Sequence, residues 1–210
     1  MTTRKTATVA GTALLASLFS LNASAAWDGL YIGASFAWVD ADEDWTSDEN
    51  DDPISASDSG SALGILWGYN FQKDQLVIGV EADIAATSAD PGVSDWGSAD
   101  FIGTDLEAVA RLRTRVGFVI AQDFLPFVSL GVALAQTETS IDSERFDSVR
   151  TGLSYGFGVE WAASDSLRAR FEVSRDEYSS EGFGSYNALS DSAFGSLDTE
   201  NVSLGFIYAF

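Results

Sequence analysis

The feature that most constrains this chain is a strict alternation of large apolar side chains with small or charged ones. In residues 76–86, for example, Ile78 and Val80 fall on one face, while Gly79 and Glu81 fall on the other. A period of two predicts β-strands, because successive side chains of a strand point to opposite sides. The same pattern recurs in eight runs: 30–38, 62–71, 76–86, 106–120, 126–137, 151–162, 167–175 and 201–210.

The two faces of these runs suggest which solvent surrounds the fold. One face carries leucine, isoleucine, valine and aromatic residues, and the other carries glycine, alanine, serine and paired charges. Eight apolar faces would form a continuous band that lipid tolerates and water does not. Runs of about ten residues also match tilted strands that cross a bilayer. We therefore expect an all-β, eight-stranded antiparallel transmembrane β-barrel. The alternative is a soluble, lipocalin-like barrel whose aromatic residues line a ligand pocket.

The connections between the runs alternate in length. Those at 72–74, 122–124 and 164–166 are short, and those at 40–59, 87–105, 138–150 and 177–199 are long. Short periplasmic turns and long external loops are typical of single-chain outer-membrane barrels. An even number of strands places both chain ends on the periplasmic side.

The first 25 residues are typical of a secretory signal. Arg4 and Lys5 precede an apolar stretch at 7–21, and small residues follow at 23–25. The stretch is short of the roughly 20 apolar residues that a spanning helix needs. We expect a removed signal peptide at 1–25 and one barrel domain at 26–210, located in the outer membrane of a Gram-negative cell.

Charged residues gather on the face that would point into the barrel. Five acids and five arginines share it: Glu81, Asp83, Glu107, Glu160, Glu172, Arg111, Arg113, Arg115, Arg168 and Arg170. Arginine binds carboxylates through two parallel hydrogen bonds. An eight-stranded barrel is only wide enough to hold side chains, so we expect a self-neutralised plug. The alternative is an ion pathway or anion site.

Composition excludes several classes of function. The chain has no cysteine and no histidine, which removes disulfides, thiol chemistry and imidazole-based catalysis. With no nucleophile motif either, we expect no catalytic site and no enzyme activity. The net charge of −21 argues against binding to nucleic acid. We expect no cofactor.

The first long loop carries a weak calcium signal. Asp40, Asp42 and Asp44 have the spacing of a calcium-binding loop, but Trp45 stands at the sixth position, where the turn needs glycine. We expect a solvated acidic loop with, at most, weak binding of divalent cations that could bridge it to lipopolysaccharide.

Five segments carry a further signal: 27–33 (WDGLYIG), 80–84 (VEADI), 113–118 (RTRVGF) and 156–161 (GFGVEW), together with the closing FIYAF of 206–210. They resemble segments of the small opacity-type, OmpA-like and porin-like outer-membrane proteins. The resemblance implies that Phe206, Tyr208 and Phe210 form the signal that the outer-membrane assembly machinery recognises. Members of the family are structural envelope proteins, small porins, adhesins or immune targets, and some bind haem. This chain has no histidine for haem.

Three functions remain open on this basis. The first is a structural envelope barrel with a plugged lumen, embedded in outer-membrane lipid and lipopolysaccharide. The second is a narrow, porin-like channel for small solutes. The third is a surface adhesin or ligand binder, whose acidic and aromatic external loops would meet a host or surface ligand.

Overall fold

The computed structural model describes residues 27–47, 54–96, 99–121, 123–141, 144–179, 181–183 and 193–210. The signal peptide predicted at 1–25 lies outside these residues. The described strands are β1 (Gly29–Ser47), β2 (Ile54–Lys73), β3 (Leu76–Ala89), β4 (Gly92–Trp96), β5 (Ala99–Phe118), β6 (Phe124–Ile141), β7 (Glu144–Ala162), β8 (Leu167–Tyr178), β9 (Glu181–Phe183) and β10 (Ala193–Ala209). The described part of the chain contains no helix long and apolar enough to cross a membrane.

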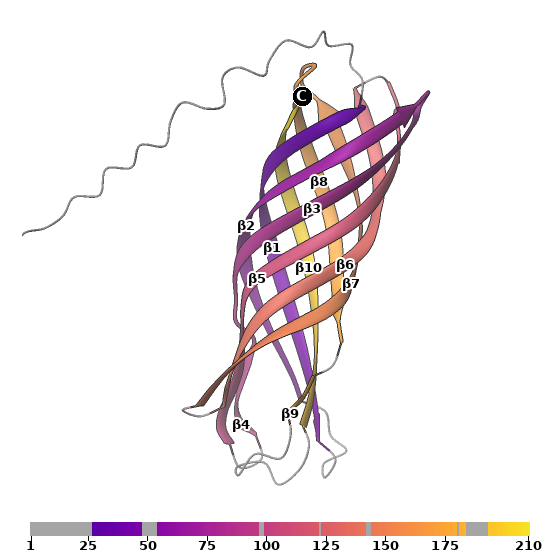
Figure 1. Cartoon of the computed structure of the whole chain (residues 1–210). Helices are drawn as coiled ribbons and strands as arrows, with labels where there is room; N and C mark the ends of the chain where they lie inside the picture. Colours follow the sequence, from indigo (N-terminus) through magenta and orange to yellow (C-terminus); the bar gives the residue numbers. More distant parts are fainter. Residues whose placement is uncertain are drawn as a thin grey trace, which may run out of the picture.

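Eight long strands form one closed antiparallel barrel (Figure 1). The order is β1-β2-β3-β5-β6-β7-β8-β10, and the ring closes because β10 also pairs with β1. Two short strands, β4 and β9, pair with the ends of β5 and β10. Closure leaves no exposed sheet edge in the barrel wall, which lipid would not tolerate. The predicted eight-stranded architecture is confirmed.

The two ends of the barrel differ. The C-terminus and the tight turn between β2 and β3 lie at one end, and β4 and β9 lie at the other (Figure 1). In that turn Asp74 has a φ of 54°, in the left-handed region that aspartate tolerates. As in other barrels of this type, the short-turn end is periplasmic and the opposite end is external.

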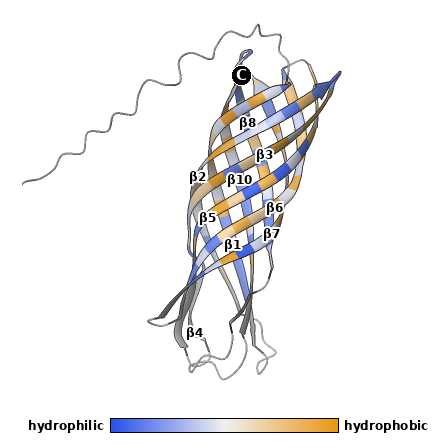
Figure 2. Cartoon of the chain, in the orientation of Figure 1, coloured by the Kyte–Doolittle hydropathy of each residue, from blue (hydrophilic) through white to orange (hydrophobic). Residues whose placement is uncertain are grey.

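The apolar face points outward, as the alternation predicted. Ile65 is 53% exposed and Trp67 is 47% exposed, whereas Arg113 and Arg115 are buried. Figure 2 shows apolar and polar residues alternating along the strands that cross the band. The soluble alternative is therefore wrong, since it requires these aromatic residues inside and the arginines in water.

The strands extend further at the external end than the sequence pattern predicted. β1 continues through Ser47 and β2 begins at Ile54, so most of the expected loop at 40–59 is β-structure. The expected loops at 87–105, 138–150 and 177–199 are likewise shortened by strand extensions. Beyond the lipid band many outward side chains are polar, so the apolar period ends. The backbone ladder continues because its hydrogen bonds do not depend on that period.

A bulge in β5 changes which side chains enter the barrel. Leu106 pairs with Thr137, but Ala108 pairs with Gln136, so β5 holds one extra residue there. A bulge reverses the alternation locally. Leu106 is therefore buried with Val109 in one apolar cluster, and Glu107, between them, is exposed.

Candidate functional site

The charged site is built by alternate residues of four strands. Neighbouring strands place opposite charges directly across from each other: Glu81 of β3 faces Arg113 of β5. Similarly, Glu160 of β7 faces Arg170 of β8. Cross-strand pairs of this kind have their Cβ atoms within about 5.5 Å, so the register itself brings acid to base.

Glu81 is one centre of the network. Its carboxylate accepts hydrogen bonds from Arg170 Nη1 at 2.8 Å and Arg170 Nη2 at 2.5 Å, which makes a bidentate pair across the lumen. Arg113 Nη2 donates at 3.2 Å and Arg115 Nη1 at 3.4 Å. The hydroxyl of Tyr31 donates to the same group at 2.8 Å. Tyr31 fits because Gly68 lies under its ring, where a Cβ atom would collide with the ring carbon Cζ.

Glu160 is a second centre. It lies 2.6 Å from Arg115 Nη1, 2.7 Å from Arg170 Nη2 and 3.9 Å from Arg168 Nη1. Because Arg170 bonds both Glu81 and Glu160, the two centres form one connected network.

Three of these arginines also lie over aromatic rings, and the guanidinium carbon of Arg170 is 5.3 Å from the centroid of Phe127. The guanidinium carbon of Arg115 is 4.2 Å from the centroid of Phe127, and that of Arg168 is 4.6 Å from the centroid of Trp27. Such contacts stabilise a cation whose surroundings exclude water. Trp27 belongs to an apolar cluster near the short turns, so the network is capped on its periplasmic side.

The network continues toward the external end through Arg111. Arg111 Nη1 lies 3.0 Å from Asp83, and Arg111 Nη2 lies 2.7 Å from Asp176. Asn201 and Thr199 also donate to the Asp176 carboxylate. Above them lies an apolar cluster that includes Val39, Leu106, Val109, Tyr178 and Leu197.

A separate ion pair lies beyond the lipid band. Arg150 Nη2 donates to Glu43 at 2.8 Å, and both side chains are fully buried. Burial raises the pKa of Glu43, and the guanidinium of Arg150 opposes that shift. The pair joins strands β1 and β7, between which β8 and β10 lie in the barrel wall, in the external half of the barrel.

The described interior is electrically balanced. It contains six arginines, Arg111, Arg113, Arg115, Arg150, Arg168 and Arg170, and six carboxylates, Glu43, Glu81, Asp83, Glu160, Glu172 and Asp176. Buried charges are tolerated when they are paired in this way. Among the residues whose side chains the structure describes, the excess of acids over bases therefore lies outside this network.

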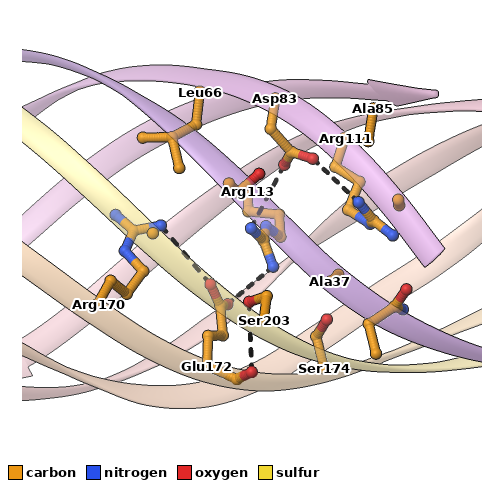
Figure 3. Close-up of a pocket in the computed structure, with 14 residues that line it drawn as sticks. Ala37, Leu66, Asp83, Ala85, Arg111, Arg113, Arg170, Glu172, Ser174 and Ser203 are labelled. Atoms are coloured by element: carbon orange, nitrogen blue, oxygen red, sulfur yellow. Dashed lines mark hydrogen bonds and ion pairs between the residues drawn. The ribbon is translucent and has the colours of Figure 1, made fainter. Parts of the chain in front are cut away.

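A small cavity lies beside the network. It has a volume of about 40 Å³ and lies between the charged wall and a wall of small residues such as Ser203 and Ala37. Figure 3 shows Arg111, Arg113 and Glu172 converging on it. A water molecule needs roughly 10–15 Å³, so the cavity admits only a few waters.

Nine of the ten charged residues singled out from the sequence lie in this network. Glu107 does not: the bulge turns it outward, where Gln136 donates to it at 3.0 Å, so its expected place inside was wrong. Three further charged residues of the interior were not predicted from the sequence: Asp176, Glu43 and Arg150. Asp176 continues the inward alternation after Glu172, but the other two lay in stretches taken for loops.

The weak metal candidates do not converge. Asp40, Asp42 and Asp44 are exposed along strand β1, where alternate residues are roughly 6.5 Å apart, and not in a compact loop. Asp40 accepts from Ser59, and Asp44 accepts from Ser55. Among the residues that the structure describes, no three acidic side chains are grouped to hold a metal ion.

The residues of the expected assembly signal lie on β10 and at its end. Phe206 is 75% exposed on the lipid-facing side, and Phe210 packs edge-on against Tyr208 with ring centroids 5.3 Å apart. Their role in assembly stays a prediction.

Residues 11–210 match the family model for the outer membrane protein beta-barrel domain. The chain is 27% identical to the 25 kDa outer-membrane immunogenic protein of Brucella canis, over 88% of this chain and 78% of that one. It is also 27% identical to the 22 kDa outer membrane protein of Rhizobium leguminosarum bv. viciae, over 85% and 76%.

Solved structures show the same fold. The outer membrane protein OprG from Pseudomonas aeruginosa superposes with a TM-score of 0.58 at 17% identity, covering 87% of this chain and 97% of that one. Neisserial surface protein A superposes with a TM-score of 0.53 at 14% identity, covering 90% and 100%. With its closed barrel, lipid-facing apolar band and charged interior, the chain belongs to the outer membrane protein beta-barrel domain family and is located in the outer membrane of Gram-negative bacteria.

Proposed function

We propose that this protein is a structural barrel of the cell envelope whose lumen is closed by its own ion pairs. The observation that carries the proposal is the bidentate pair between Arg170 and Glu81, which spans the interior with Arg113 and Glu160 at its sides. A network with equal numbers of opposite charges, capped by apolar clusters, has little reason to admit a solute.

Conductance tests this proposal. Purified, refolded barrel in planar lipid bilayers should give no sustained large-pore current. Heat-modifiable mobility on gels should verify that the inserted protein is folded. Stable openings on the nanosiemens scale from folded protein would contradict a closed lumen.

A narrow channel is the second candidate, favoured by the cavity of about 40 Å³ beside Arg111 and Arg113. If that cavity lies on a path, the path carries water or small ions only. Brief, low-amplitude openings that disappear when Ser203→Leu fills the cavity would support this function over the first.

Surface presentation is the third candidate. Relatives from Brucella are named immunogenic, and the outward side chains of the external strand extensions include many acids. Deleting residues 184–192, with barrel folding checked by gel mobility, should abolish binding to a host or surface ligand if this function applies. We expect lipid, lipopolysaccharide and the assembly machinery to be the protein's other partners, and we expect no enzyme activity.

A further inference from the structure

A groove interrupts the lipid-facing surface near the periplasmic end. It is shallow and widely open to the side, and it is lined by the outward side chains of Leu76, Val116, Phe118, Pro126 and Val128.

The groove exists because of what β5 and β6 place there. Gly117 pairs with Phe127, and both are buried toward the lumen, so only backbone forms the floor between the two strands. On β6 the compact ring of Pro126 is exposed near the strand start, where β5 presents Phe118. The bulky outward side chains and the backbone floor between them leave a groove that is open to the acyl chains of the membrane.

A positive charge lies one strand beyond the Leu76 edge of this groove. Lys73 is exposed on the outer face of β2, directly across the β2–β3 pairing from Leu76. Leu76 in turn pairs with Phe118. Lys73 is the exposed basic residue among the described residues of this rim, whose other exposed charges are the acids Asp28, Asp74, Asp123 and Asp165.

We infer that this groove is a binding site for one phospholipid of the periplasmic leaflet, with an acyl chain between Phe118 and Val128 and the headgroup phosphate on Lys73. The charge argues for a phospholipid, because a phosphate at the end of an apolar chain complements an ammonium beside an apolar groove. A second copy of the barrel would instead bring its own acidic rim against this one.

The test measures retained lipid in the full-length mature protein. Barrels are reconstituted in vesicles of phosphatidylethanolamine and phosphatidylglycerol, extracted in mild detergent and weighed by native mass spectrometry. The wild type should retain one phospholipid. Val128→Trp, which fills the groove, should lower retention more than tenfold. Val132→Trp, an equally outward position on the same strand, should leave it unchanged.

The charge is tested separately. Lys73→Gln should lower retention about fivefold, as expected for one basic residue at a membrane surface, and Lys73→Arg should restore it. A photoreactive acyl chain should crosslink within residues 116–128. Equal retention by the two tryptophan variants would mean bulk lipid only and would overturn the proposal. A dimer that Val128→Trp abolishes would overturn it in favour of a second copy.

Discussion

At the scale of the residue, Glu81 shows how many hydrogen bonds one buried carboxylate can accept. It accepts hydrogen bonds from Arg113, Arg115, Arg170 and Tyr31. Glu81→Gln keeps the shape of the side chain and leaves the arginines one negative charge short. Removing one partner of a buried pair costs about 3–5 kcal/mol. Urea unfolding in micelles, monitored by tryptophan fluorescence, should therefore show a decrease of that size in the free energy of unfolding.

Glu107→Gln is the matched control for that variant. Glu107 is exposed and accepts a hydrogen bond from Gln136 outside the barrel. The free energy of unfolding of the Glu107→Gln variant should therefore differ from that of the wild type by less than about 0.5 kcal/mol. Equal losses in the two variants would mean that Glu81 is no more important to the fold than a surface acid.

Asp90 should titrate at an unusual pH. A hydrogen bond with Asp105, partial burial and the charges of Asp105 and Asp58 together raise the pKa of Asp90 to about 6, from 3.8. Since a raised carboxyl pKa means that the protonated form fits the fold better, this contribution to stability is complete below about pH 3.8. It is lost as the pH rises through about 6.

Carboxyl NMR titration of the barrel in micelles measures this directly. The Asp90 signal should have its midpoint near pH 6, and Asp105→Asn should move that midpoint toward the ordinary value. A midpoint near pH 4 in the unmodified protein would contradict the hydrogen bond between Asp90 and Asp105.

At the scale of the strand, the sequence predicts the apolar alternation that lipid requires. It does not predict the features that depend on backbone pairing alone. The alternation identifies the membrane-crossing parts of all eight long strands, because hydrocarbon demands an apolar side chain at every second position. The alternation cannot reveal the bulge at Glu107. The extra residue does not change the kinds of side chain in the strand, and it shifts only the backbone pairing between β5 and β6. Glu43 and Arg150 were missed for a related reason: they enter the lumen from polar extensions without an apolar period.

The last strand makes the element-scale prediction about assembly. Phe210 lies at the end of β10, half exposed beside Tyr208. Phe210→Asp removes an aromatic group from the expected recognition signal without touching the lumen. We expect slower insertion in cells, measured as unfolded protein on heat-modifiability gels after a pulse of synthesis. Leu204→Asn, an outward change outside the signal, serves as the control, and equally slow insertion of both variants would argue against a terminal signal.

For the whole molecule, the contrast between a neutral interior and an acidic exterior predicts its response to salt. Asp42 lies opposite Asp198 and Asp40 lies opposite Glu200 where β1 pairs with β10, and like charges at such positions destabilise a sheet. Arg175 offsets part of this repulsion through contacts of 3.0 Å to Asp198 and 2.8 Å to Glu200. Buried pairs are screened far less than exposed ones.

Raising NaCl from about 0.01 M to about 1 M, which shortens the Debye length from roughly 30 Å to 3 Å, should therefore stabilise the barrel. The gain should appear as a higher urea midpoint and as stronger hydrogen-exchange protection in the external parts of β1 and β10. Asp42→Asn should raise stability by about 0.2–1 kcal/mol at low salt and should reduce the salt response. If salt instead lowers the midpoint, attraction within the lumen outweighs repulsion on the surface, and the interior is more open to ions than its burial indicates.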